Sequence, residues 1–303
     1  MSSSASKRFY YARVSVLSLV LLAVLAYAAR DHRRRSARRE WQRPLQVALV
    51  LLADGELEPA GLARLQQQVE PLEQQLEDQF ARYGGTFRPI RFQQFGPVQE
   101  PSPPPASADE PSLWQALTLS LSLGAYARRC DRAAGVSGGN DFDGKIYLRL
   151  SQPHSARRSL VEGLGEDGGR VAVTSLELRE DSADFGLFVV AHELFHLLGA
   201  SDRYGADGLA ELPDGLGEPE LVPQFPQRSV EVMARGRVIA PGREEPPGQL
   251  AELRVGTKTA AEIGWSSSTV PPGASPSETS PSETGLPEAR PPEPGLSPEP
   301  RRR

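Results

Sequence analysis

The most informative stretch of the sequence is His192-Glu193-Leu194-Phe195-His196-Leu197-Leu198-Gly199-Ala200-Ser201-Asp202. It begins with the pattern H-E-x-x-H, whose two histidines lie one above the other on the same face of a helix. From that face both imidazoles can bind one Zn²⁺, and Glu193 can reach a water molecule on the metal. The alternative is a core helix with two hydrogen-bonded histidines. A charged Glu193 in so apolar a helix needs a partner, which favours the metal site.

The residues around this pattern predict a buried helix that ends near Gly199. Residues 185–191 are apolar nearly all round, which is typical of a helix inside a core. Asp181 and Ser182 precede them and can cap backbone N–H groups. Glycine commonly ends a helix in a left-handed conformation, so the turn at Gly199 can bring Asp202 back towards the metal.

A zinc site for hydrolysis has three protein ligands and a water, so a third ligand is needed. Asp202 is the expected one because the turn delivers it. Glu218 or Glu220 would replace it if the site used a later segment, and His154 is a further alternative. The remaining histidine, His32, lies in a basic run and has no ligand spacing.

The pattern H-E-x-x-H-x-x-G-x-x-D resembles that of the metzincin zinc peptidases, and its aspartate version is similar to the snapalysin type. Metzincins usually have a third histidine, so Asp202 leaves the subfamily open. A second match is Val232-Met233-Ala234-Arg235, since metzincins place a methionine turn beneath the metal. Met233 is the only methionine apart from Met1. The resemblance extends from about Ser182 to Trp265.

Zinc chemistry assigns a role to each of these residues. His192, His196 and Asp202 would hold the metal, which lowers the pKa of a bound water and polarises a carbonyl. Glu193 would take the proton of the attacking water. Tyr204 is a candidate for donating a hydrogen bond to a developing oxyanion or to substrate, although an ordinary loop tyrosine is the alternative.

The rest of the chain predicts an α+β fold with a mixed, twisted sheet and long helices, as in zincins. Strand–helix–strand order near the start is typical of a right-handed crossover. The resemblance to zinc peptidases implies a sheet edge above the cleft that binds extended substrate by backbone pairing, and the strand just before the histidine helix is the expected edge. We expect strands at 45–52, 86–95, 145–150 and 170–178, helices at 59–83 and 113–133, and a last helix within 250–265.

Three parts of the chain differ in composition. Residues 1–43 carry a net charge of +8 and are expected to anchor the protein in a membrane. Residues 44–266 carry −12 and are expected to form the metallopeptidase domain; their charge argues against nucleic-acid binding. Residues 267–303 hold 10 of the 28 prolines and a repeated Ser-Pro-Ser-Glu-Thr. Such a Pro/Ser/Glu-rich tail cannot bury enough apolar surface to fold, so we expect disorder.

The apolar run from Val14 to Ala29 is expected to be a single-pass anchor in the lipid bilayer, with Arg13 reaching towards the headgroups. A cleaved signal peptide is the alternative, because Ala26-Tyr27-Ala28 has the A-x-A form of a cleavage site. Arginines are denser after the run than before it, which favours a cytoplasmic domain. A secreted peptidase needs the opposite, so the side of the membrane stays open. The one cysteine, Cys130, excludes an internal disulfide.

These features predict a membrane-anchored zinc metalloendopeptidase that acts on a peptide or protein substrate. Two other functions remain open: a zinc-binding scaffold without catalysis, and a zinc hydrolase of a non-peptide amide or ester. Glu193 argues against the scaffold, because a structural site needs no general base. The G-x-G-x-x-G pattern at residues 163–168 is interpreted as a turn between strands, since no helix follows it and two carboxylates would face a phosphate.

Overall fold

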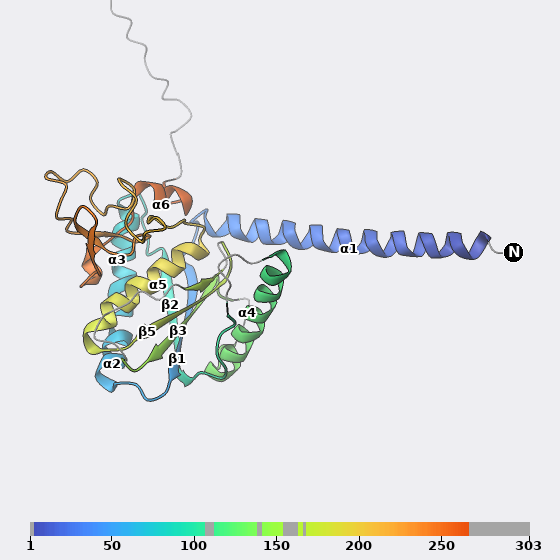
Figure 1. Ribbon diagram of the computed structural model, residues 1–303, viewed down its shortest axis with the longest axis horizontal. Helices are drawn as coiled ribbons and strands as arrows, with labels where there is room; N and C mark the ends of the chain where they lie inside the picture. The colour runs from blue at the N-terminus through green and yellow to red at the C-terminus, as the bar shows by residue number, and fades with distance from the viewer. Residues whose placement is uncertain (1–2, 107–111, 138–140, 154–162, 166–167, 267–303) are drawn as a thin grey trace, which may run out of the picture. The chain divides into compact units, whose positions relative to one another are not determined.

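The computed structural model describes residues 3–106, 112–137, 141–153, 163–165 and 168–266 (Figure 1). The predicted tail and His154 therefore lie outside the described residues. The helices are α1 Ser3–Arg38, α2 Pro59–Gln67, α3 Val69–Ala81, α4 Leu113–Ala134, α5 Ala183–Leu197 and α6 Thr257–Glu262. The strands are β1 Leu45–Asp54, β2 Ile90–Gln99, β3 Gly144–Ser151, β4 Leu164–Gly165, β5 Val171–Glu177, β6 Val230–Glu231, β7 Arg237–Ala240, β8 Arg243–Glu245 and β9 Leu253–Arg254.

The main sheet has the order β2-β1-β3-β5-β4. Its first four strands are parallel, and β4 is antiparallel to β5. The interior strand β1 is buried from Val47 to Leu52, as expected for a parallel strand covered on both faces. The predicted mixed sheet with helices is confirmed.

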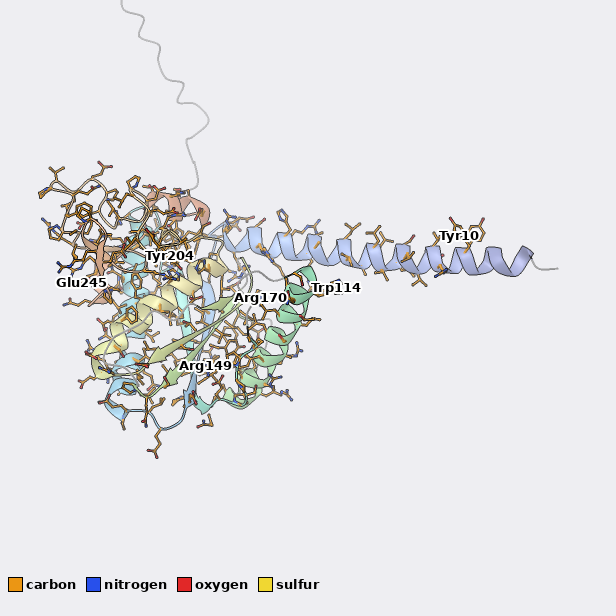
Figure 2. The ribbon with its side chains drawn as sticks, viewed as in Figure 1. Tyr10, Trp114, Arg149, Arg170, Tyr204 and Glu245 are labelled. Carbon is orange, nitrogen blue, oxygen red and sulfur yellow. The ribbon has the colours of Figure 1, made fainter. Side chains whose placement is uncertain are left out.

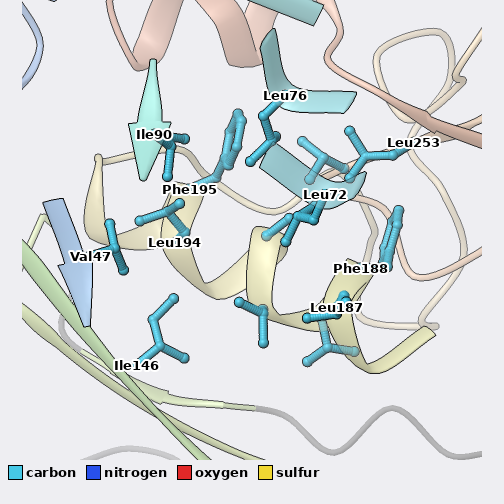
Figure 3. Close-up of a cluster of buried hydrophobic side chains, with 14 of the residues drawn as sticks. Val47, Leu72, Leu76, Ile90, Ile146, Leu187, Phe188, Leu194, Phe195 and Leu253 are labelled. Carbon is cyan, nitrogen blue, oxygen red and sulfur yellow. The ribbon is translucent and has the colours of Figure 1, made fainter. Parts of the chain in front are cut away.

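The two faces of the sheet carry separate cores. Alternate residues of β1 point to opposite faces, so Val47 packs with α3 and α5 whereas Ala48 packs with α4. Figure 3 shows part of the larger core, which includes Leu72 of α3, Phe195 of α5 and Ile146 of β3. The histidine helix therefore lies on one face of the sheet and α4 on the other (Figure 1).

The expected edge strand is wrong. β5 forms as predicted, but β4 pairs with its outer side through Leu164↔Val173 and Gly165↔Ala172. The strand that ends the sheet comes from the G-x-G-x-x-G pattern, which was interpreted as a turn. A two-residue strand has no periodicity to detect, and its glycines resemble turn signals. The chain continues from there into β5 and not into a helix, which agrees with the rejection of a phosphate loop.

The helix expected at 59–83 is divided into α2 and α3, with Gln68 between them. Pro71 accounts for the break. It has no N–H for the carbonyl of Gln67, four residues earlier, and its ring would collide with that carbonyl in a continuous helix.

The strand expected at 86–95 is displaced and becomes β2, which begins at Ile90. Pro89 cannot donate a ladder hydrogen bond, although its carbonyl accepts one from the Leu45 N–H at 2.8 Å. The apparent alternation before Pro89 therefore lies outside the strand.

The last helix is shorter than the 250–265 segment that contains it. A 3₁₀ turn and β9 occupy the first residues, and α6 begins after Gly256. The sequence Thr259-x-x-Glu262 has the form of a capping box, but it does not cap the helix, because Thr259 lies inside α6 and is buried. Competition from β9, which pairs with β6, explains the shorter helix.

An aromatic cluster joins the beginning and the end of the domain. The ring of Trp265 lies 5.7 Å from that of Trp41, 5.2 Å from Phe80 and 5.6 Å from Phe195. Trp41 also donates its indole N–H to the Ile263 carbonyl at 2.7 Å. Trp265 is buried, so it closes this end of the core.

α1 is a single helix whose length and apolar composition are sufficient to cross a membrane. A signal sequence near the N-terminus meets the same criteria. Its apolar side chains are exposed. Its last residue, Arg38, is buried and donates hydrogen bonds to the carbonyls of Gly169 at 2.6 Å, Gly168 at 2.8 Å and Asp143 at 3.2 Å. The end of α1 is thereby fixed to the domain.

Candidate metal centre

The core of the domain positions the two histidines. α5 is apolar nearly all round and buried along most of its length, so it is held by packing on both sides. Gly199 follows with φ of +92°, the left-handed conformation predicted for it. His192 and Glu193 are both buried, and His196 is less so.

Each imidazole is held through its Nδ1 atom by a backbone carbonyl. His192 Nδ1 lies 2.9 Å from the Val232 carbonyl, and His196 Nδ1 lies 3.0 Å from the Ala200 carbonyl. Since a carbonyl only accepts, each Nδ1 carries the proton and each Nε2 presents a lone pair. The two Nε2 atoms are only 3.1 Å apart. Two lone pairs so close repel each other unless a cation or a proton lies between them.

Asp202 completes a triangle with these two nitrogens. Its Oδ1 atom lies 3.4 Å from His192 Nε2 and 3.2 Å from His196 Nε2. A tetrahedral zinc with bonds of about 2.0–2.1 Å holds its ligands about 3.3 Å apart, so the three separations fit. Oδ1 is buried and accepts no hydrogen bond from the described residues when both rings are in the Nδ1–H form.

The other suggested ligands lie elsewhere or are not described. Glu218 accepts a hydrogen bond from the Arg228 N–H at 3.0 Å, and neither it nor Glu220 joins the triangle. His154 lies outside the described residues, and His32 is an exposed residue of α1. The structure thus brings together the three residues predicted as ligands; their binding of a metal stays a prediction.

The electrostatics of the triangle favour a positive charge within it. Burial alone would raise the pKa of Asp202, but hydrogen bonds and charge from the two imidazoles hold it well below its usual range. Burial alone would lower the pKa of His196, yet the neighbouring Asp202 raises it overall. Both shifts have the same cause, which is stabilisation of positive charge next to the carboxylate.

Glu193 is adjacent to this triangle and is tightly enclosed. Burial raises its pKa, against the opposing charges of the two histidines and a hydrogen bond from the Gly163 N–H. Gly163 directly precedes β4, so the sheet edge passes over the carboxylate. A Cβ atom on Gly163 would lie 2.1 Å from the Glu193 carboxyl carbon, so only glycine fits without movement.

The segment containing Met233 contacts His192 through its backbone. Val232 supplies the carbonyl for His192, and the side chain of Met233 is fully buried. Glu231 holds this turn by accepting hydrogen bonds from the N–H groups of Met233 and Gly256, which ties it to the start of α6. Burial raises the pKa of Glu231. The sequence pattern indicated Met233 but not Glu231.

The loop that carries Asp202 is fixed from the opposite side. Arg203 is buried and forms an ion pair of 2.6 Å with Glu262 of α6. The same Glu262 oxygen accepts the Ser201 N–H at 3.0 Å, and the Arg203 N–H donates to the Met233 carbonyl at 2.9 Å. Sequence reasoning missed these supports, since an arginine beside a ligand gives no spacing to its distant partner.

Tyr204 lies beside α5 (Figure 2), with its ring nearly parallel to that of His192 and 6.4 Å from it. The guanidinium of Arg235 lies over the tyrosine ring at 4.3 Å. Burial and the Asp202 charge raise the pKa of Tyr204 to about 12, so its hydroxyl stays a donor near neutral pH. Its position next to the triangle agrees with a role in substrate binding, which stays a prediction.

No family model matches the sequence, and no curated protein matches it. Among solved structures, the chain is similar to an archaemetzincin from Methanopyrus kandleri, with 16% identity, coverage of 55% of this chain and 79% of that one, and a TM-score of 0.32. It is also similar to a chaperone–substrate complex, with 12% identity, coverage of 73% of this chain and 33% of that one, and a TM-score of 0.31. At TM-scores this low neither likeness carries weight, so the functional argument rests on the triangle of His192, His196 and Asp202.

Proposed function

We propose that this protein is a zinc-dependent peptide hydrolase that α1 anchors in a membrane. The observation that carries the proposal is the convergence of His192 Nε2, His196 Nε2 and Asp202 Oδ1 at separations of 3.1 to 3.4 Å. All three atoms are acceptors when the two rings carry their protons on Nδ1. An isolated protein gains nothing from such a cluster, whereas a tetrahedral divalent cation satisfies all three at once.

The residues around the triangle would act as follows. Bound zinc would supply a Lewis acid and an activated water. His192 and His196 need no rearrangement, because the Val232 and Ala200 carbonyls already fix their tautomers. Glu193 would accept the proton of the attacking water and pass it to the leaving amine. The Gly163 N–H, facing the same carboxylate, would keep it in one orientation.

Two observations favour an enzyme over a zinc-binding scaffold. A purely structural zinc site takes four protein ligands, whereas only three converge in the described part of the chain. Burying Glu193 is also costly for the fold, as its raised pKa indicates, and a scaffold would have no use for it. Tyr204, protonated and adjacent, is proposed to donate to the substrate carbonyl.

The test uses the full chain purified in detergent and saturated with zinc. We expect close to one bound zinc per chain and chelator-sensitive cleavage of a mixed peptide library. Glu193→Gln should lower the rate by roughly 10²- to 10⁴-fold while zinc stays bound. Glu100→Gln is the matched control, because it alters a buried carboxylate on the opposite face of the sheet, in the α4 core.

The outcomes separate the rival functions. Zinc without any hydrolysis would favour the scaffold, and hydrolysis of esters or simple amides without peptide cleavage would favour the other hydrolase. Absence of zinc after purification without chelators would refute the proposal. The anchor is tested separately: the full chain should resist alkaline extraction from membranes, and a mature N-terminus near Ala29 would indicate a cleaved signal instead.

A further inference from the structure

We propose that the first two turns of α4 form a second membrane contact, which lays one end of the domain on the bilayer that α1 crosses. The contacting residues are Trp114, Leu117 and Leu121, called here the α4 stripe. The inference rests on the anchoring part of the proposed function, but it does not depend on zinc or on hydrolysis.

The sequence of α4 is unusual for a helix facing water. No charged side chain occurs from Leu113 to Ala127, whereas Arg128 and Arg129 follow directly. An exposed helix normally carries charged residues on its outer face. The helix begins with a complete capping box between Ser112 and Gln115, which stabilises its first turn.

The α4 stripe is the exposed apolar part of this helix. Trp114 is 77% exposed, Leu117 50% and Leu121 65%. Their spacing of three and four residues places them on one face. The later half of α4, by contrast, packs against the sheet through Leu123 and Tyr126. The helix therefore continues beyond the core that supports it and carries large apolar side chains there.

The position of the stripe indicates a bilayer as its partner. Figure 2 shows Trp114 on the side of the domain towards which the apolar part of α1 extends. α1 stays helical up to the buried Arg38, about 14 Å beyond Ala29 at 1.5 Å per residue, so the domain is held close to the end of the span. Tryptophan prefers the membrane–water interface, where its apolar ring and its N–H are both accommodated.

The charge next to the span and the small area of the α4 stripe also favour a bilayer. Arg30, Arg33 and Arg34 are exposed between the apolar run and the domain, where anionic headgroups would neutralise them. A second copy of the chain is less suitable, because three side chains on one helix supply far less than the roughly 800 Å² per partner of a stable interface. A lipid surface has no such minimum, since the span already holds the domain beside it.

The distribution of tryptophans gives a direct test. Of the three tryptophans, Trp41 and Trp265 are buried in the aromatic cluster and Trp114 is exposed. The full chain is reconstituted into vesicles of phosphatidylcholine and phosphatidylglycerol whose acyl chains carry bromine, which quenches tryptophan on contact. We expect part of the emission to be quenched, and Trp114→Phe to remove that part and leave the remainder unchanged.

Two variants and one assay make the result specific. Leu117→Ser with Leu121→Ser should reduce the quenching of Trp114, whereas Val222→Ser, at an even more exposed apolar residue outside α4, should not. Protein that stays in the membrane with Trp114 unquenched would overturn the α4 contact while leaving the anchor intact. Trp114 emission that shifts to the blue with protein concentration, without bromine quenching, would assign the stripe to a second copy instead. Protein that alkaline extraction removes would refute the anchor itself.

Discussion

The two faces of the sheet bury charge in opposite ways. On the α4 face, Lys145 and Asp131 form an ion pair of 2.6 Å, and Tyr147 donates to the same carboxylate at 2.7 Å. On the α5 face, two imidazole nitrogens and the Asp202 oxygen turn towards one another. The first group contains its own cation, whereas the second presents only acceptors.

The difference distinguishes a structural polar cluster from a site that needs a ligand. Arg149 and Glu100 repeat the α4 arrangement with an ion pair of 2.8 Å, so that face is balanced without any external ion. Buried polar groups are stable when each has a partner. The group of His192, His196 and Asp202 on the α5 face meets that condition only with a cation. Substitutions on the α4 face should therefore change stability, whereas those on the α5 face should change zinc affinity or kcat.

The largest expected effect is on the α4 face. Lys145→Met leaves the Asp131 carboxylate buried without its cation, so the free energy of unfolding should fall by about 3 kcal/mol. Denaturant unfolding in detergent, followed by tryptophan fluorescence, measures this. Zinc affinity should not change. Lys145→Met combined with Asp131→Leu should recover most of the loss, and a double variant as unstable as the single one would contradict the comparison.

The next effect concerns the sheet edge over Glu193. Gly163→Ala forces the carboxylate to move by more than 1 Å from its position, and such displacement costs about 10²-fold in kcat. Zinc content should be retained. In a Glu193→Asp background, whose side chain is shorter, the added methyl group should cost much less. Equal losses of kcat in the wild-type and Glu193→Asp backgrounds would show that the added methyl group does not act through the Glu193 carboxylate. Gly124→Ala is the control, because a Cβ atom has room there.

A smaller effect is expected from the support of the Asp202 loop. Glu262→Gln weakens the ion pair with Arg203, so the loop should hold Asp202 less firmly and zinc affinity should fall by about 10-fold. Competition with a chelator of known affinity measures the change. Glu245→Gln removes an exposed ion pair with Arg237 and should leave the affinity unaltered. An unchanged affinity in Glu262→Gln would show that the loop is rigid without this pair.

The smallest effect is the pH dependence of the metal-free protein. The pKa of His196 is raised in the folded protein, so its protonated form stabilises the fold. This stabilisation is complete below the pKa of the unfolded chain, about 6.5, and is lost as the pH rises through the higher pKa of the folded protein. Metal-free protein should therefore melt at a higher temperature near pH 6 than near pH 8. Zinc should reverse the trend, because it competes with that proton.

A control is needed because burial also raises the pKa of Glu193 and Glu231, which shifts stability in the same direction. The difference between the pH dependence of the melting temperature in the wild type and in His196→Gln gives the contribution of the histidine alone. Asp202 stays ionised over this range, since its pKa is lowered and its contribution is lost only on strong acidification. Identical pH profiles of melting temperature for both proteins would show that His196 does not cause the pH dependence.

The sequence predicted what is encoded locally. The helix signals around α5, the turn at Gly199 and the spacing to Asp202 all lie within about twenty residues, so periodicity and spacing were sufficient to bring the three candidate ligands together. The predicted bounds of β1, β3 and α4 agree with the structure within one or two residues, because their periodic apolar patterns are also local.

What the sequence did not predict depends on distant partners. The Val232 carbonyl on His192, the Glu262 carboxylate on Arg203 and Gly163 over Glu193 are contacts across 30 to 59 residues. None has a periodic signal. β4 was missed for the same reason: its two residues become a strand only because β5 offers them an edge.

The aromatic cluster has a consequence for how the domain folds. Trp41 and Ile263, joined by a hydrogen bond, are 222 residues apart, and Trp265 packs on Trp41, Phe80 and Phe195, which lie far before it in the chain. Closing so long a loop costs conformational entropy before the contacts within the cluster can offset it. We therefore expect this part of the core to form late in folding. During synthesis Trp41 can pack on Phe80, but the cluster is completed only when Trp265 has been made.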